Sequence, residues 1–255
     1  MRDVGLEEAI KAVGGITELA RRIGISQPSV SNWDRVPAER VLAVEAATNV
    51  NRVILRPDLF GENVGADEID LARAQEYALL SVLLSRAPDA ALLKTLTKLK
   101  GDSTPLGIAH IELAEAASQS KPEAIEREYF NLFIGLGRGE LLPYGSYYLT
   151  GFLHERPLAR LRDDLAKIGL ERNDGNAEPE DHAAILCEIM SGLANGRFPA
   201  PAGTDHMIFE KHLAPWIGRF FADLETAQEA DFYRRVGSLG RVFIEVESAS
   251  FALPA

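Results

Sequence analysis

Two short segments hold polar side chains whose types and spacing could do chemistry. EPEDH, residues 178–182, places carboxylates and an imidazole within five positions. Such groups can bind a metal ion or a cationic partner. SQPSVSNWDR, residues 26–35, repeats hydroxyl and amide side chains along a short helical pattern. Those groups can bond base edges and phosphates of a nucleic acid.

Other signals of catalysis or metal binding are weak. GLGRG, residues 135–139, has no preceding strand and no following GK[ST], so it indicates a helix stop rather than a phosphate loop. No GxSxG nucleophile elbow is present. Glu178, Asp181 and His182 lack the i, i+4 histidine pair of a common zinc helix. We expect no catalytic residue, no metal ligand and no cofactor. A metal-dependent hydrolase stays an alternative that elemental analysis would detect.

Pro179 is placed to begin a helix within EPEDH. Glu180 and Asp181 would then lie at the positive N-terminal end of that helix. By composition alone, an acidic helix start is the simplest interpretation of the segment.

The two segments lie in parts of the chain that differ in charge. The formal net charge is −11, yet residues 1–60 hold eight basic and eight acidic residues. The negative charge therefore falls on the remainder, which predicts two parts with different partners. The single cysteine, Cys187, excludes an internal disulfide framework and a cysteine-based zinc site.

The composition, 46% hydrophobic and 25% charged, is that of a soluble globular protein. No stretch approaches 18 uninterrupted apolar residues, and the N-terminus lacks the apolar core of a secretory signal. We expect a cytoplasmic protein.

Helical periodicity runs through both parts, so we expect an all-α fold. A small helix-turn-helix domain would occupy residues 1–61. A linker would occupy residues 62–68, within the segment RPDLFGENVGADE that is rich in Gly, Pro and acidic residues. A larger helical bundle would fill residues 69–250. The long helices expected there cover 67–86, 88–99, 106–119, 121–134, 146–153, 157–168, 179–194, 206–224 and 228–248.

ITELARRIGISQPSVSNW, residues 16–33, has the features of a helix-turn-helix. Ala20 must be small because the second helix crosses close to it, and Gly24 permits the positive φ of a tight turn. Ser26 can cap the second helix, and Pro28 falls in its first turn. The DNA-binding candidates are the polar residues left on that helix or at its end: Gln27, Ser29, Ser31, Asn32 and Arg35.

This segment resembles the Cro-like helix-turn-helix family, most closely its branch related to the YdaS antitoxin. RVPAERVLAVEAAT and RPDLFG extend the resemblance. It implies a transcriptional repressor that is often dimeric. A dimer would help, because a neutral domain has weak electrostatic affinity for DNA. Two alternatives stay open: a small helical bundle without a nucleic-acid role, and a docking module that never meets DNA.

Aromatic residues gather in EYFNLFIGLGRGELLPYGSYYLTGFL, residues 128–153. An aromatic-lined groove with polar tips would suit an extended peptide or an amphipathic helix. The alternative is that these rings fill a helical core.

The order Y-x-x-L-F-x-G, glycine-rich loop, P-Y-x-S-x-Y and E-P-x-D-H resembles the TorD/DmsD/NarJ group of redox-enzyme maturation chaperones. Residues 209–245 resemble the last two helices of that group. The resemblance implies an all-helical chaperone that binds the twin-arginine leader of a molybdenum-containing oxidoreductase precursor during cofactor insertion. Carried onto this chain, together with the acidic Glu178, it implies these peptide-binding residues: Tyr129, Leu132, Phe133, Pro143, Ser146, Tyr147, Glu178, Pro179, Asp181 and His182.

One departure is Gly145, which stands where the group often has glutamate and puts one carboxylate contact in doubt. PYGSYYLTGFLHERPLARLR looks most like chaperones associated with formate dehydrogenases. The expected function is a leader-binding chaperone with a fused DNA-binding domain that would regulate transcription. The alternative is a one-component transcriptional regulator whose helical domain senses a small ligand.

Overall fold

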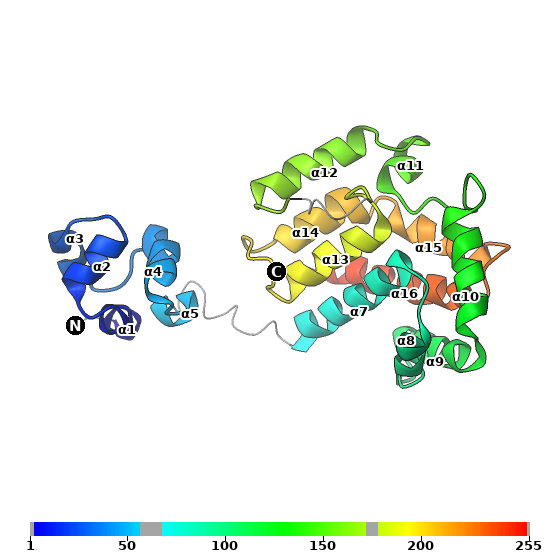
Figure 1. Cartoon of the computed structure of the whole chain (residues 1–255), viewed down its shortest axis with the longest axis horizontal. Helices are drawn as coiled ribbons and strands as arrows, with labels where there is room; N and C mark the ends of the chain where they lie inside the picture. The colour runs from blue at the N-terminus through cyan, green and yellow to red at the C-terminus, as the bar shows by residue number, and fades with distance from the viewer. Residues whose placement is uncertain (1–2, 57–67, 172–177, 254–255) are drawn as a thin grey trace. The chain divides into compact units, whose positions relative to one another are not determined.

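The computed structural model describes residues 3–56, 68–171 and 178–253. The chain divides into two compact units, Met1–Asp67 and Glu68–Ala255, and each is described by itself. Within the described ranges the secondary-structure elements are helices (Figure 1). These ranges also contain one isolated β-bridge, between Tyr144 and His182. The expected all-α fold is confirmed. The linker expected at 62–68 lies outside the described residues, apart from Glu68, which begins a helix.

Short helices surround a single apolar core in the first unit. Leu6, Leu19, Val30, Val44 and Leu55 are among its fully buried side chains. The helices are α1 (Val4–Ala12), α2 (Ile16–Arg22), α3 (Gln27–Ser31), η1 (Ala38–Arg40), α4 (Val41–Thr48) and α5 (Arg52–Leu55).

The turn between α2 and α3 has the geometry that its sequence predicts. Gly24 has a φ of 71°, which suits a glycine. Ala20 is buried beneath α3, and its carbonyl accepts the Ile25 amide at 3.0 Å. Ser26 is the N-cap of α3, but its hydroxyl pairs with Ser29 Oγ at 2.7 Å instead of capping a backbone amide. The helix-turn-helix geometry is present.

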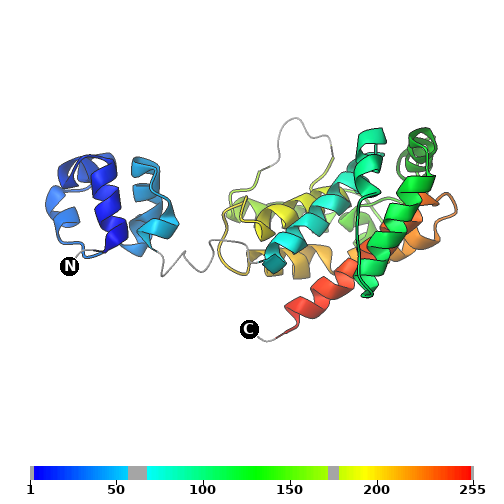
Figure 2. The ribbon, with the colours of Figure 1, turned by 90° about the horizontal axis from the view of Figure 1, so that it is seen from below.

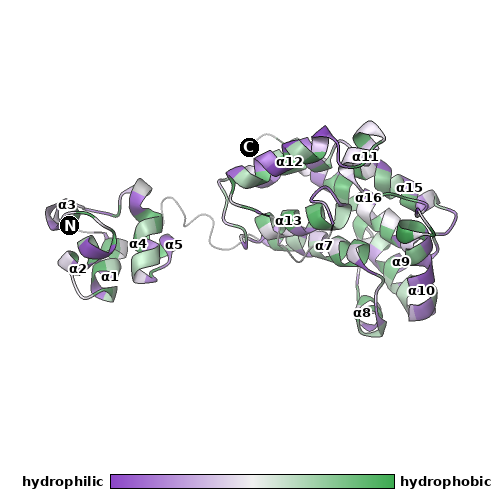
Figure 3. Cartoon of the chain, turned by 45° about the horizontal axis from the view of Figure 1, so that its top comes forward, coloured by the Kyte–Doolittle hydropathy of each residue, from purple (hydrophilic) through white to green (hydrophobic). Residues whose placement is uncertain are grey.

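In the second unit, α7 runs alongside α13, and α16 packs against α9 and α15 (Figures 1 and 2). Figure 3 shows α13 as a largely hydrophobic helix, in keeping with its burial. Trp216, Phe220, Phe221 and Tyr233 are fully buried in the common core. The elements are α7 (Glu68–Ser85), α8 (Ala90–Leu96), α9 (Pro105–Gln119), α10 (Pro122–Tyr129), η3 (Phe130–Ile134), α11 (Gly145–Thr150), α12 (Arg156–Lys167), α13 (Ala183–Ala194), α14 (Thr204–Ile208), η4 (Phe209–Leu213), α15 (Ile217–Thr226) and α16 (Phe232–Phe251).

Several predicted helix boundaries are wrong. The helix predicted at 206–224 is two helices, because a π-helical turn, η4, and a turn at residues 214–216 interrupt it. A second π-helical turn, η3, ends the helix predicted at 121–134. Apolar periodicity continues through both π turns, so the pattern alone does not reveal them.

The start of α16 is capped by a side chain from α10. The Glu128 carboxylate accepts the amides of Asp231, Phe232 and Tyr233 at 2.8, 3.1 and 2.6 Å. Three otherwise unsatisfied donors of the helix end are therefore bound by one carboxylate.

We expect Glu128→Ala to lower the free energy of unfolding by about 2 kcal/mol, the upper range for a lost N-cap. Urea denaturation would measure this loss. Glu126→Ala, an exposed position on the same helix, is the control and should change stability by less than about 0.5 kcal/mol. Equal effects of the two substitutions would contradict the capping role.

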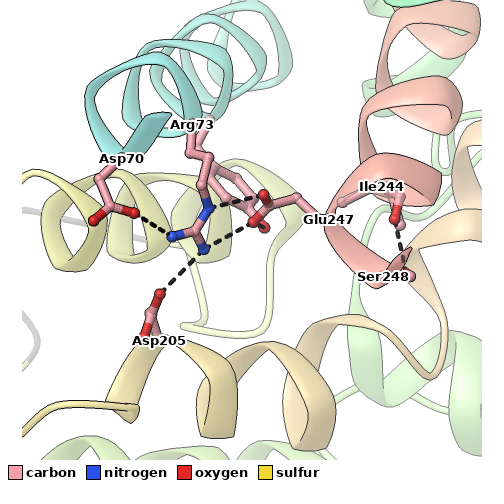
Figure 4. A network of polar contacts seen from close by, with 7 residues as sticks. Asp70, Arg73, Asp205, Ile244, Glu247 and Ser248 are labelled. Atoms are coloured by element: carbon pink, nitrogen blue, oxygen red, sulfur yellow. Dashed lines mark hydrogen bonds and ion pairs between the residues drawn. The ribbon is translucent and has the colours of Figure 1, made fainter. Parts of the chain in front are cut away.

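A buried ionic network ties α7 to α14 and α16 (Figure 4). The Arg73 guanidinium donates to both oxygens of Glu247, at 2.8 and 3.0 Å. It also pairs with Asp70 at 2.7 Å and with Asp205 at 3.1 Å. Tyr77 Oη donates to Glu247 at 2.9 Å. Burial opposes the charge of Arg73, but these carboxylates raise its pKa overall.

Candidate functional site

The PYGS and EPEDH motifs meet in the isolated β-bridge of the second unit. The Gly145 amide donates to the Asp181 carbonyl at 2.9 Å. In return, the Ala183 amide donates to the Pro143 carbonyl at 2.8 Å. Helices α11 and α13 thus begin side by side at this bridge. Two motifs that are far apart in the sequence form one local structure.

Asp181 and His182, at the bridge, each cap a helix with their side chains. Asp181 Oδ2 accepts the Ser146 amide at 2.7 Å, and His182 Nδ1 accepts the Ala184 amide at 3.1 Å. Because Nδ1 accepts this bond, the imidazole is neutral and carries its proton on Nε2. Burial lowers the pKa of His182, although the carboxylates of Glu178 and Asp181 oppose the shift. At neutral pH the cap is therefore intact.

The helix expected to start at Pro179 instead starts at Ala183. Glu180 and Asp181 lie in the turn before it, so the prediction of an acidic first turn is wrong. The reason is the bridge, which holds His182 in an extended conformation opposite Tyr144. Tyr144 Oη donates to Glu178 Oε2 at 2.6 Å, and this bond holds the start of the turn. Burial and the nearby Glu178 carboxylate raise the pKa of Tyr144.

Two adjoining cavities follow α13, and both are lined by Glu178, Ile185 and Glu188. We call the pair the α13 groove. The first cavity, about 420 Å³, lies between α13 and α7, with Ser81 and Ser85 on the α7 side. The second, about 500 Å³, lies between α13 and α12.

The α13 groove combines an apolar lining with an excess of carboxylates. Arg162 pairs with Glu180 at 2.7 Å, and Arg197 lies 3.6 Å from Glu188. Among the described residues that line the groove, these two guanidinium groups are accompanied by four carboxylates, those of Glu171, Glu178, Glu180 and Glu188. The apolar side chains of the second cavity are Leu165, Ala166, Leu170, Ile185, Ile189 and Phe198. Such a surface can hold an apolar segment and the cations beside it.

Tyr129, Glu178 and His182 are the predicted peptide-binding residues that line the α13 groove. Tyr129 Oη donates to the Leu84 carbonyl at 3.2 Å, and burial raises the pKa of Tyr129 to about 12. Pro179 lies in the same turn, and its carbonyl accepts the His182 amide.

Four of the predicted peptide-binding residues do not line this groove. Leu132 is 0% exposed in the core, so its side chain does not line the groove in this structure. Phe133 packs against Tyr233, with ring centroids 5.4 Å apart. Pro143 and Ser146 are buried at the bridge. The apolar face of α10 and η3 packs into the bundle. For these residues the structure agrees with the alternative that their side chains fill a helical core.

Tyr147 lies apart from the groove, on α11. Its hydroxyl bonds to Arg138 at 2.6 Å, and the Arg138 guanidinium also lies over its ring. The contact ties the GLGRG turn to α11. This agrees with the prediction that GLGRG is a helix stop rather than a phosphate loop.

Sequence reasoning missed Ile185, Glu188 and Ile189 as groove residues. One signal could have found them: Glu188 is the single charged residue in AAILCEIMSGLA, residues 183–194. A single charged residue in an apolar helix indicates the side of the helix that faces solvent, because a lone carboxylate is rarely buried.

A third cavity, about 440 Å³, lies on the other side of the bridge and is lined by Gly145 and Asp181. Asp164 bonds to two side chains there: Lys167 Nζ is at 2.6 Å and His212 Nε2 at 2.9 Å. Its bonds to Lys167 and His212 lower the pKa of Asp164 to about 2.

We expect the stabilisation contributed by Asp164 to be complete above about pH 4 and to be lost as the pH falls to about 2, because the folded state holds the carboxylate ionised. Asp164→Asn should remove this part of the pH dependence of unfolding, measured with urea between pH 2 and 6. Asp163→Asn, at the exposed neighbouring position, is the control. Parallel pH profiles for wild type and Asp164→Asn would contradict the assignment.

In the first unit, the predicted DNA-binding residues Gln27, Ser29, Asn32 and Arg35 are exposed, and Ser31 is half-buried. Gln27 Nε2 donates to Ser31 Oγ at 2.8 Å. Nearby, Arg21 and Arg22 both bond to Glu18 and lower its pKa to about 2. The local basic charge is thus partly neutralised.

Among the described residues, no group of three or more His, Cys, Asp or Glu is arranged to hold a metal ion. None of the helices in the described ranges combines the length and apolar character that a bilayer crossing requires.

Comparison with known proteins assigns each unit a similarity. Residues 99–222 match the family model of the nitrate reductase delta subunit, and residues 6–64 match that of the bacterial toxin YdaS. The chaperone protein TorD of Vibrio atlanticus (strain LGP32) is 23% identical over 203 residues, covering 71% of this chain and 94% of that protein. TorD of Escherichia coli O8 (strain IAI1) is 27% identical over 195 residues, covering 74% and 89%. A solved redox enzyme maturation protein from Archaeoglobus fulgidus has a TM-score of 0.47 and 23% identity, covering 68% and 93%.

Proposed function

Because the second unit belongs to the TorD/NarJ family of redox-enzyme maturation chaperones and the first is a Cro-like helix-turn-helix, we propose that this chain binds the twin-arginine leader of a molybdoenzyme precursor. The family consists of maturation chaperones, and the chain is not an enzyme. Its members bind enzyme precursors, and binding would last until cofactor insertion is complete.

The α13 groove is the observation that carries this proposal. A twin-arginine leader combines two guanidinium groups with an apolar helix. The apolar lining of the second cavity suits the helix, and the carboxylate excess suits the guanidinium groups. Guanidinium–carboxylate pairs give directional, charge-assisted bonds at such a rim.

Titration with a synthetic leader peptide, followed by calorimetry, tests the proposal. We expect saturable binding by the full chain, weakened when both arginines of the peptide are replaced by glutamine. No binding of either peptide would contradict it and would favour the small-ligand regulator. A formate dehydrogenase leader is the client that we propose first, and leaders of other molybdoenzymes provide the comparison.

We propose further that the first unit binds DNA. The exposed side chains of Gln27, Ser29, Asn32 and Arg35 support this, because amide, hydroxyl and guanidinium groups on such a helix can bond base edges and phosphates. A second copy would double the contact and compensate for the low basic charge. Operator affinity measured with and without saturating leader would test whether the client regulates transcription.

We expect Asn32→Ala to reduce discrimination for the preferred operator by about 1–3 kcal/mol, the value of a bidentate base contact. Arg35→Ala should weaken binding to all sequences and lessen its salt dependence. Mobility-shift titrations at two salt concentrations would measure both. Glu8→Gln, an exposed change on α1, is the control. Wild-type affinity in both variants would contradict DNA binding through α3.

A further inference from the structure

We propose that Asp181 and His182 are positioning residues, which cap two helices and hold the α13 groove in shape without contacting the bound leader. The inference rests on the leader binding proposed above. It separates the residues of EPEDH into two roles: the exposed Glu178 faces the client, whereas Asp181 and His182 act on the backbone.

The first observation is how the two helix starts are satisfied. The first amides of α11 and α13 are bound across the bridge, by the carbonyls of Asp181 and Pro143. The second amides, those of Ser146 and Ala184, are bound by the Asp181 carboxylate and the His182 imidazole. At each helix start, a backbone carbonyl accepts the first amide and a side chain accepts the second. Without the side chains these buried donors have no acceptor.

The second observation is burial. Asp181 is 3% exposed and His182 is 7% exposed. Asp181 Oδ1 has no hydrogen-bond partner among the described residues, but it is shielded from solvent, as is Ser146 Oγ. The carboxylates of Glu178 and Glu188 line the α13 groove and are exposed, whereas Asp181 does not line it. The imidazole uses Nδ1 for its cap and presents only its remaining edge to the groove.

The third observation is what the caps hold. His182 sets the start of α13, and Ile185 and Glu188 follow within the next two turns of that helix. Asp181 holds the start of α11 against the same bridge. Tyr144, in the bridge, fixes Glu178 through its hydroxyl. Loss of either cap would thus displace the groove residues on the client side.

Asparagine substitutions test the inference, because asparagine keeps a cap acceptor and removes the charge or the imidazole. We expect Asp181→Asn and His182→Asn to bind the leader within about threefold of wild type. Asp181→Ala and His182→Ala should bind at least about tenfold more weakly, which is about 1.4 kcal/mol. The alanine variants should also melt several degrees lower and exchange the Ser146 or Ala184 amide faster.

Direct contact predicts the opposite pattern. If the asparagine variants lost as much binding as the alanine variants while their melting temperatures stayed at the wild-type value, the positioning role would be overturned. Failure of the leader proposal itself is distinguishable, because wild type would then not bind the peptide. In that event melting and amide exchange still decide the capping role: unchanged values in the alanine variants would overturn it.

Discussion

Glu247→Ala should lower the free energy of unfolding of the second unit by about 3–5 kcal/mol, the cost of breaking a buried ion pair by removing one partner. Glu247 is 1% exposed and lies on α16, facing Arg73 and Tyr77 of α7. Substitution leaves a guanidinium that is mostly buried with only Asp70 and Asp205, and a buried phenol with no acceptor. Both desolvated donors then destabilise the fold.

Urea denaturation of the full chain, monitored by tryptophan fluorescence, would measure this loss. Trp33 lies in the first unit and Trp216 in the second, so each unit contributes its own fluorescence change. Glu245→Ala is the matched control. It lies two residues earlier on α16, and its side chain is 64% exposed in a pair with Arg241. It should cost less than about 1 kcal/mol. Equal losses in the two variants would show that the buried network contributes no more than an exposed ion pair, because alanine itself favours the helix.

Reversing two charges of the α13 groove should weaken leader binding at least about 100-fold, since each reversal removes an attraction and adds a repulsion, at about 1.4 kcal/mol for each factor of ten. The variant is Glu178→Lys with Glu188→Lys, both residues lying at the junction of the two cavities. Calorimetric titration of the leader peptide at low and high salt would measure the change. High salt should narrow the difference, because these carboxylates are exposed.

The control for this experiment changes the net charge equally at another place. Glu123→Lys with Glu126→Lys alters the exposed side of α10 and should leave leader affinity within about threefold. An equal loss in both double variants would mean that the overall negative charge attracts the leader and that the groove does not read it. Melting temperatures of both variants check that the Tyr144–Glu178 bond is not needed for folding.

Local sequence signals were sufficient for part of this protein. The helix-turn-helix turn needs a small residue and a positive φ within a few positions, and Ala20 and Gly24 supply both. Periodic apolar residues were sufficient for the all-α class. These features depend on neighbours along the chain, so a single sequence reveals them.

The orientation of side chains around EPEDH needed the tertiary structure. Helix α13 is apolar on nearly every side, so periodicity does not show which side faces an opening. The family resemblance implied that Leu132 and Phe133 contact a peptide, yet their helix turns them toward the core.

From the amino-acid pattern alone it follows that there are two helical parts, that one has the turn of a DNA reader, and that EPEDH and PYGS are the unusual segments of the other. The folded chain was needed to see that these segments pair, that the helix begins at Ala183 rather than Pro179, and that Glu178 and Glu188 line the same groove. The physical reason is the range of the forces involved. Helix formation follows from bonds four residues apart, whereas the bridge and the Asp181 cap join residues 35 or more positions apart, and hydrogen bonds at that separation leave no periodic pattern in the sequence.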